Sequence, residues 1–542
     1  MITETPEKPQ DVLRDQLREA HALQAFDLAK MRWIPVVYRN GEIRHVGIEE
    51  LLSSAHEIKD IAEPDPIVRA ALRRFTEALC AQLVRLAGSG GANWRFRAEH
   101  NAGFSETEVT TLVRDQQEYL WLYHPSFPFL QDIRLIKALT KPEWFSSDDL
   151  VANLPSEHEA AWFVKPGEPA SAKGLDPASA ALGLVARWFY HLPGNSASVS
   201  TPDGTNTAQY GGAFSEGVAT TTHAFRISPV GLATTLLRNL TPAMVTATDM
   251  RESGCFGPAW MNRDRSSISQ DSLYLGTLTA SSVLLTAPEE DLRIHALVRG
   301  PVPQAKEGVK IARDLALAHD IHRVVSVSIS KDGTTKETAL RKRPSEHPLR
   351  ILDSLHRAAL NAGQGRLRGV VNEGDLWLSG AKGRHDESIE LFLAYKQGTG
   401  SSPKWSETRV VNLPAAHLDP DTSQFQSLVP ILAACFDDKS GITSRLRWAI
   451  MDALLDPEEG NRPRHHVSVD GLVDVARGRW LELAAARVES AISTQSDPVE
   501  CTQLLFADAR TIFHEVLAPY MRSTRYAASI VKAQRRLWEK KR

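Results

Sequence analysis

Apolar and polar positions near the N-terminus predict a β-hairpin followed by a long helix. The apolar runs at residues 34–38 and 43–46 flank Asn40-Gly41, a pair typical of the tight turn in a hairpin. From residue 66 to residue 86, apolar side chains recur at intervals of three and four, which is the spacing of a helix with one face in the core. We therefore expect a small sheet and a core-facing helix at the start of the fold.

Glycine and proline interrupt residues 154–217 too often for long helices or strands. We expect loops to dominate this stretch. Long irregular loops are uncommon in compact domains and are usually functional or disordered, so this is the first place to look for a binding surface.

The last part of the chain is helical in pattern. Helical periodicity covers residues 426–456, 467–494, 498–519 and 522–541, with short breaks between them. The third helix should begin at Asp497-Pro498, because aspartate caps a helix and proline suits its first position. Short connections between four helices predict an antiparallel bundle. The expected fold class is α+β, with a large mixed α/β domain at residues 1–415 and an all-α four-helix bundle at residues 420–542.

Composition narrows the class of protein. The chain has 542 residues, of which 42% are hydrophobic and 24% are charged, as in ordinary globular proteins. Its polar N-terminus lacks the apolar stretch of a signal peptide, and its longest apolar runs are too short to span a membrane, so we expect a cytoplasmic protein with no membrane contact. The formal net charge of −3 means that any nucleic acid must be bound by local basic patches or through partners.

Motifs for catalysis or cofactor binding are incomplete. The pairs His56-Glu57, His158-Glu159 and His514-Glu515 all lack the second histidine of a zinc-protease helix. We found neither a phosphate-binding glycine loop nor a Gly-x-Ser-x-Gly elbow. The four cysteines are widely separated and are interpreted as ordinary buried thiols. We expect no cofactor and no catalytic cluster, although carboxylates and histidines distant in sequence can still meet in a fold.

Several short segments occur in a distinctive order. They are Trp33-Ile34-Pro35-Val36, Pro128-Phe129-Leu130-Gln131, Phe163-Val164-Lys165-Pro166-Gly167, Tyr210-Gly211-Gly212-Ala213-Phe214 and Thr220-Thr221-Thr222-His223-Ala224-Phe225. In order and spacing they resemble the CasA family, the large subunit of the type I-E CRISPR Cascade surveillance complex. With the helical C-terminal part, the resemblance extends over nearly the whole chain.

The resemblance implies a non-catalytic subunit that binds double-stranded target DNA. Such a subunit recognises the motif that flanks the target, initiates strand separation and helps to recruit a separate helicase-nuclease. Its other implied partners are the remaining Cascade subunits and the CRISPR guide RNA. Some relatives carry paired CxxC motifs, whereas this chain keeps only Cys255 near the second of those places, so we predict no structural zinc.

Motif recognition is expected at Tyr210, Gly211 and Gly212, together with Lys306 or Lys310. Glycines let the backbone approach a groove closely. The minor groove distinguishes A·T from G·C pairs and little more, so tolerant motif reading is expected. A simple turn at the two glycines and a solvated lysine remain the alternatives.

The resemblance implies two further contacts near these loops. Gln397 is expected to enter the duplex end as a wedge, with Lys396 on a phosphate and Gly398 allowing the turn. Opening the first base-pair step of the duplex costs a few kcal/mol. A side chain that takes the place of the separated bases in the stack offsets this cost until the guide RNA pairs with the target strand. A plain hairpin tip is the alternative. The second contact, with the guide-RNA end or a neighbouring subunit, is expected at Phe163, Val164 and Lys165, with core packing as the alternative.

The last helix is strongly basic. Residues 522–542 carry eight basic residues and one acidic residue, for a charge of +7. Such a stripe suits phosphates of the displaced, non-target strand and would make binding depend on salt. The residues expected there are Arg522, Arg525, Lys532, Arg535 and Arg536.

Two other classes of function stay open. One is a metal-dependent nuclease or hydrolase whose carboxylates converge only in the fold, which predicts cleavage by the purified protein with divalent ions. The other is a protein scaffold that never contacts DNA, which predicts that Gln397→Ala and Gly211→Asp leave target binding unchanged.

Overall fold

The structure of the chain is a computed structural model, and it forms two compact units. Unit 1 comprises Met1–Val325, Thr338–Pro344 and Arg368–Asn412; unit 2 comprises Ser326–Glu337, Ser345–Leu367 and Leu413–Arg542. The expected α+β class is confirmed. The structure describes residues 9–21, 23, 26–87, 92–135, 144–150, 174–190, 194–200, 206–210, 220–245, 257–261, 271–279, 281–301, 320–329, 334–360, 365–368, 386–397, 404–456, 462–463, 468–494 and 496–538.

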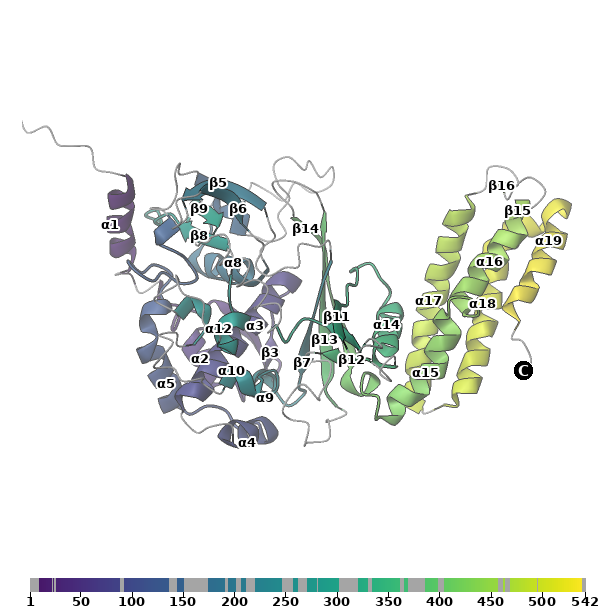
Figure 1. Ribbon diagram of the computed structural model, residues 1–542, viewed down its shortest axis with the longest axis horizontal. Helices are drawn as coiled ribbons and strands as arrows, with labels where there is room; N and C mark the ends of the chain where they lie inside the picture. The colour runs from purple at the N-terminus through teal and green to yellow at the C-terminus, as the bar shows by residue number, and fades with distance from the viewer. Residues whose placement is uncertain are drawn as a thin grey trace, which may run out of the picture. The chain divides into compact units, whose positions relative to one another are not determined.

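Unit 1 mixes helices with several small antiparallel sheets (Figure 1). Its helices are α1 (Pro9–His21), α2 (Ile48–Ser53), α3 (Pro66–Leu86), α4 (Ala92–His100), α5 (Glu106–Asp115), α8 (Pro177–Tyr190), α9 (Leu232–Arg238), α10 (Pro242–Val245) and α12 (Ser272–Gly276). Its strands are β1 (Ile34–Tyr38), β2 (Ile43–Val46), β3 (Ile58–Ile61), β4 (Trp144–Ser146), β5 (Gly194–Ser200), β6 (Asn206–Tyr210), β7 (Thr220–Ile227), β8 (Ser281–Leu285), β9 (Ala296–Pro301), β13 (Ser388–Gln397) and β14 (Lys404–Pro414).

The expected hairpin and the expected helix are both present. Strands β1 and β2 pair antiparallel from Ile34↔Val46 to Val37↔Ile43, and Gly41 takes the positive φ of 87° that the turn requires. Helix α3 begins where Asp65 accepts hydrogen bonds from the first backbone N–H groups of the helix. Residues along α3 are almost all buried, so this helix forms the centre of the unit 1 core.

The expectation that loops dominate residues 154–217 is wrong for part of that stretch. Residues 177–190 form α8, and residues 194–200 and 206–210 form β5 and β6. The sequence from Ala180 to Tyr190 is apolar apart from Arg187 and is free of proline, so it forms a buried helix once Pro177 starts it. Its one glycine, Gly183, allows close packing, because a Cβ atom there would lie 2.7 Å from the Cβ atom of Leu150.

A three-stranded sheet in the order β14-β13-β7 lies on one side of this core (Figure 1). Strand β13 is central and pairs antiparallel with β7, from Ser388↔Ile227 to Tyr395↔Thr220. On the other side of β7, the segment after residue 320 continues the pairing through the bridge His223↔Arg323.

Unit 2 is mainly helical. Its helices are α14 (Pro348–Leu360), α15 (Ser423–Phe436), α16 (Ile442–Leu454), α17 (Val469–Thr494), α18 (Pro498–Met521) and α19 (Thr524–Gln534), with a short 3-10 turn at Arg535–Leu537. The strands β10 (Val325–Ile329), β11 (Thr335–Ala339) and β12 (Gly365–Arg368) form a small sheet mostly within this unit, and β15 (Leu455–Asp456) pairs with β16 (Arg462–Pro463).

The expected C-terminal helices are present, with the first predicted helix in two pieces. Helix α16 packs against α17, α18 and α19, while α15 packs against α17 and α18. The predicted helix 426–456 breaks at residues 437–441 because the Asp437 carboxylate accepts the backbone N–H groups of Lys439 and Ser440 and forms a tight turn. The predicted cap at Asp497 is confirmed, since its side chain accepts the backbone N–H of Val499 at 2.9 Å. Among the described helices, none is long and apolar enough to cross a membrane.

Candidate nucleic-acid interface

Two of the predicted DNA-contacting residues lie at one end of the β14-β13-β7 sheet. Lys396 and Gln397 are the last two residues of β13, directly after the Tyr395↔Thr220 pair. Gly211, Gly212 and Gly398 lie outside the described residues, but Gly212 precedes Thr220 by only eight positions. Tyr210 is the last residue of β6 and pairs with Gly194.

The same end of the sheet carries a basic segment, which we define as Arg341, Lys342 and Arg343. The backbone N–H of Lys342 donates to Thr222 Oγ1 on β7 at 3.0 Å. The guanidinium of Arg343 lies over the ring of Tyr395, 5.0 Å from its centre. The sequence prediction missed this segment. Its signal was the run of three basic residues, but only the fold places that run beside Tyr395.

A buried polar network holds β7 in place. The hydroxyl of Tyr190 on α8 lies 2.8 Å from Nδ1 of His223, and Nε2 of His223 lies 3.8 Å from Oδ2 of Asp320. Asp320 also pairs with Arg74 of α3 at 3.2 Å. Next to it, Nε2 of His322 lies 2.8 Å from Glu77 of the same helix. Residues of α3, α8 and β7 and the segment around residue 320 are therefore fixed relative to one another.

Burial decides the protonation state of this network. Burial lowers the pKa of His223 to about 3, and the positive charge of Arg74 acts in the same direction. Asp320 opposes the shift, but its charge is already paired with Arg74. Burial would raise the pKa of Asp320, yet the charges of Arg74 and the nearby histidines outweigh it and lower that pKa instead. At neutral pH the network therefore holds a neutral imidazole between a tyrosine and a paired carboxylate.

A second buried network attaches β13 to the core. The Arg73 guanidinium donates to Glu390 of β13 at 2.8 Å and to Asp60 of β3 at 2.9 Å. Arg69 adds a 2.7 Å ion pair with Glu390. Burial would raise the pKa of Asp60, but the charge of Arg73 outweighs it and lowers that pKa. Strand β13, which ends at Lys396 and Gln397, is thus anchored to the core by paired charges.

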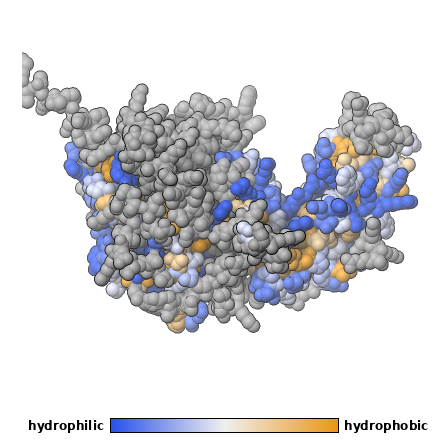
Figure 2. Space-filling view, viewed as in Figure 1, coloured by the Kyte–Doolittle hydropathy of each residue, from blue (hydrophilic) through white to orange (hydrophobic). Residues whose placement is uncertain are grey.

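The basic C-terminal helix presents several of its predicted residues to solvent. Three of its apolar side chains, Tyr526, Ile530 and Leu537, are buried, whereas Val531 and Trp538 are exposed. Figure 2 shows hydrophilic residues over much of the visible face of the unit 2 helices. Exposed predicted residues are Arg522, Lys532, Arg535 and Arg536, whereas the side chain of Arg525 lies outside the description. Arg536 forms an ion pair with Asp452, so part of its charge is neutralised inside the unit.

Five other predicted site residues lie outside the described residues. They are Phe163, Val164, Lys165, Lys306 and Lys310. The roles expected of them stay predictions. The segment that holds the two lysines follows Pro301 at the end of β9 and precedes Asp320, the residue paired with Arg74.

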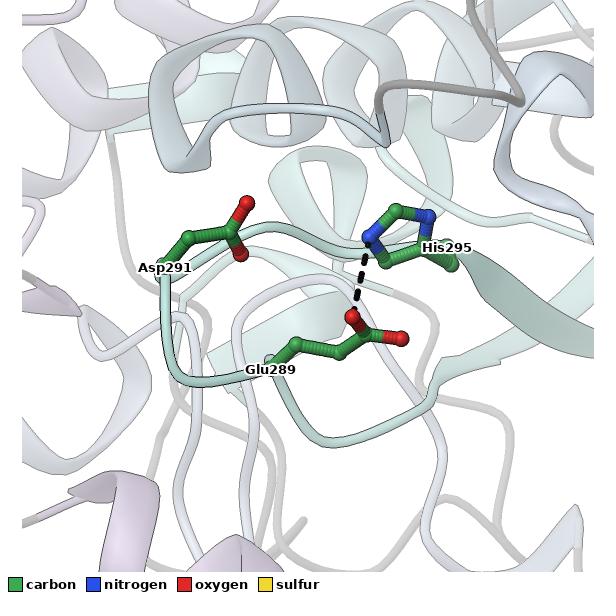
Figure 3. Close-up of side chains that lie close together, drawn as sticks. All are labelled: Glu289, Asp291 and His295. Carbon is green, nitrogen blue, oxygen red and sulfur yellow. Dashed lines mark ion pairs between the residues drawn. The ribbon is translucent and has the colours of Figure 1, made fainter.

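Within the described part of the chain, one group of side chains offers three metal-ligand atoms close together. Glu289, Asp291 and His295 come from the connection between β8 and β9, and their ligand atoms lie within 4.8 Å of one another (Figure 3). Nε2 of His295 already forms a 3.6 Å ion pair with Glu289, which is 69% exposed. Glu289 and His295 are therefore close enough to form an ion pair when the imidazole is protonated. The predicted absence of structural zinc stays a prediction, because Cys255 lies outside the described residues.

The prediction of ordinary thiols is confirmed where it is described. Cys80, Cys435 and Cys501 are buried and free. Burial raises the pKa of all three thiols. A raised pKa removes the thiolate that metal binding and nucleophilic chemistry need.

Comparison with known families identifies the chain. The family model of CRISPR-associated protein Cse1 matches residues 27–541. The chain belongs to the Cse1 family. A curated relative, CRISPR-associated protein CasA/Cse1 of Thermus thermophilus, is 28% identical over 141 residues, and the match covers 26% of this chain and 24% of that relative. The chain thus spans about a quarter of the length of this curated Cse1 relative. The expected membership of the CasA family is confirmed.

Solved Cse1 structures share the fold along nearly the whole chain. Cse1 from Acidimicrobium ferrooxidans has a TM-score of 0.69 at 19% identity, with coverage of 94% of this chain and 96% of that one. A chain of a CRISPR RNA-guided surveillance complex also has a TM-score of 0.69, at 18% identity, with coverage of 95% and 99%. At these identities the likeness establishes the fold of this Cse1 chain.

Proposed function

We propose that this Cse1 protein is a non-catalytic, cytoplasmic subunit of a CRISPR RNA-guided surveillance complex. It binds double-stranded target DNA, recognises the motif that flanks the target and begins strand separation. It then helps to recruit the helicase-nuclease that degrades the DNA. In this role Gly211, Gly212 and Lys306 or Lys310 read the motif, and Gln397 separates the first base pairs.

The pairing of β7 with β13 carries this proposal. Motif reading and strand separation must act on adjacent base pairs, so the segments responsible must lie close together. The antiparallel register sets Thr220, eight positions after Gly212, beside Tyr395, two positions before Gln397. The buried pairs of His223 with Tyr190 and of Glu390 with Arg73 hold both strands rigidly, as preorganised recognition requires.

The hydrolase alternative finds little support in the described residues. Tyr190, His223 and Asp320 lie in the order of a proton relay, but all three are buried. A catalytic base must reach a substrate, and its pKa must lie near the working pH. Burial lowers the pKa of His223 to about 3, far below neutral pH, which favours a structural role for the network.

The direct test is motif discrimination by the assembled complex. We would purify the complex from the neighbouring operon products and the guide RNA, with and without this chain, and measure mobility shifts on duplexes that differ only in the flanking motif. The complete complex should prefer one motif, and the complex without this chain should not. Gly211→Asp should remove the preference, while Gln397→Ala should retain it and slow strand opening, followed by 2-aminopurine fluorescence at the first target base.

Two results would refute the proposal. Equal motif preference with and without this chain would assign recognition to another subunit. Cleavage of DNA by the purified chain with Mg²⁺ or Mn²⁺ would support the nuclease alternative. Exposed Arg114→Ala on α5, far in sequence from these segments, serves as a control and should change neither preference nor opening.

A further inference from the structure

The basic segment is held in an extended form across the end of the sheet. Before it, the backbone N–H of Leu340 donates to the carbonyl of Val324 at 2.9 Å; after it, Arg409 of β14 donates to the carbonyl of Pro344 at 3.3 Å. Proline restricts the residue that precedes it to extended backbone, which favours this form at Arg343. The segment thus runs over β7, β13 and β14 at the end where β13 finishes.

The exposure of the segment alternates. Arg341 and Arg343 are exposed and Lys342 is half-buried, which is the pattern of an extended chain with alternate residues on one face. Two positions apart in such a chain span about 6.6 Å, so the two arginines present a pair of guanidinium groups on the same side. Arg343 is oriented by the ring of Tyr395. Stacking engages the flat face of a guanidinium, whose N–H groups lie in the plane of the guanidinium itself.

The charge around the segment is net positive. From Lys336 to Glu346 the chain contains four basic residues and two acidic residues, Glu337 and Glu346, for a local charge of +2. Two further basic residues, Lys396 on β13 and the exposed Arg409 on β14, are on the adjoining strands. A surface with a net positive charge and paired guanidinium groups suits the phosphodiester backbone of a nucleic acid.

We propose that Arg341 and Arg343 bind two neighbouring backbone phosphates of the target duplex and hold it in register against the end of β13. This inference rests on the proposed function, in which the motif-reading and wedge residues bring the DNA to the end of β13. The contacts position the duplex and carry no sequence information, since phosphates are the same in every sequence.

Phosphate contacts have a thermodynamic signature that motif contacts lack. The logarithm of the binding constant falls linearly with the logarithm of the salt concentration. Each phosphate that a protein neutralises makes this slope steeper by about 0.9 for a DNA duplex. Removing both arginines should therefore make the slope shallower by about 1.8 and weaken binding to preferred and non-preferred motifs by the same factor. The ratio of the two affinities should stay constant.

The experiment compares assembled complexes that carry this chain with Arg341→Ala/Arg343→Ala, Arg341→Lys/Arg343→Lys or Arg114→Ala. Affinity for duplexes with each motif is measured by fluorescence anisotropy from about 50 to 200 mM salt, the range over which such slopes are resolved. The alanine pair should show the shallower slope, and the lysine pair should retain most of the original slope because it keeps both charges. Arg114→Ala should leave the slope unchanged. Arg341→Ala alone, at an exposed position, should change the slope by half as much.

The outcomes separate this inference from the proposed function. An unchanged slope with the alanine pair, or a loss of motif preference, would overturn phosphate binding by the segment. Failure of the variant to join the complex in size-exclusion chromatography would assign the segment to a subunit or guide contact and would also overturn it. A shallower slope combined with unchanged motif preference in Gly211→Asp would sustain the phosphate contacts and refute the proposed motif reading.

Discussion

His223 should make the stability of unit 1 fall as the pH drops below about 6.5. Its imidazole is buried between the hydroxyl of Tyr190 and the carboxylate of Asp320. Burial lowers its pKa to about 3 in the folded protein, whereas in the unfolded chain it should have the ordinary value of about 6.5. Below pH 6.5 the unfolded chain therefore binds a proton that the folded chain does not bind.

The sign and size of the effect follow from linkage. Acid favours the state that binds more protons, so it favours unfolding at this site. Between pH 6.5 and pH 5, the histidine lowers the free energy of unfolding by about 1.4 kcal/mol for each pH unit, or about 2 kcal/mol in total. The stabilisation is complete above pH 6.5 and is lost progressively as the pH falls toward 3.

The perturbation is His223→Gln, and the assay is urea unfolding followed by tryptophan fluorescence at pH 7.5, 6.5, 5.5 and 5.0. The variant should be less stable at pH 7.5 but should lose about 2 kcal/mol less than the parent protein between pH 6.5 and 5. His45→Gln, at an exposed position on β2, is the matched control and should keep the parental pH dependence. In a protein with ¹³C-labelled histidine rings, the NMR signal of His223 is identified by its absence from the spectrum of His223→Gln. The chemical shift of this signal in the parent protein should not change between pH 8 and 5.

Equal pH dependence in the parent and in His223→Gln would refute the reasoning. So would a ring resonance of His223 that titrates near 6.5, because it would show that Asp320 stabilises the imidazolium despite its 3.2 Å pair with Arg74.

Three further substitutions or labels test the described contacts. Glu390→Gln should lower the free energy of unfolding by about 3–5 kcal/mol, because it leaves the buried charge of Arg73 without its full partner. Glu42→Gln, at an exposed ion pair, is the control and should cost far less. Arg477→Met should raise thermal stability, by up to about 1 kcal/mol, because burial lowers the pKa of Arg477 and its Nε is buried without a hydrogen-bond partner; a lower melting temperature would contradict this. Cys80 should stay unmodified by a thiol-specific disulfide reagent until the protein is unfolded, since burial raises its pKa, and rapid labelling of the native protein would count against the buried position.

Features set by neighbouring residues could be predicted from the sequence. The β1–β2 hairpin depends on the Asn40-Gly41 turn, and the start of α18 depends on the Asp497-Pro498 pair. Both involve hydrogen bonds within a few positions along the chain, so the residue types alone specify them. Helix α3 was equally predictable because its periodic apolar face is long.

Other local features were missed although their signals were present. The break between α15 and α16 falls at Asp437-Asp438-Lys439-Ser440-Gly441, a run of residues that favour turns. Apolar periodicity on both sides concealed it, since α15 and α16 both face the same core. Helix α8 was missed for the opposite reason, because the frequent glycines and prolines around it outweighed its own apolar sequence.

The composition of the candidate interface could not be derived from the sequence in the same way. Lys342 contacts Thr222 and Arg343 contacts Tyr395 only once the chain has folded, because these partners are 120 and 52 positions apart in the sequence. Alone, Arg341-Lys342-Arg343 is typical of a solvated surface run. The resemblance to CasA located Gly212 and Gln397, but it did not point to the basic segment between them in sequence.

The net charge of −3 is compatible with DNA binding because a duplex responds to the charges near it and not to the total. Arg73 with Glu390, Arg74 with Asp320 and Arg226 with Glu387 each combine opposite charges in the core and add almost nothing to the field outside. Exposed charges act only over about 8–10 Å at physiological salt, so a duplex responds to the residues next to it. At the end of β13 those residues are basic. The attraction should therefore depend on the charge of the basic segment and hardly at all on the overall net charge of the chain.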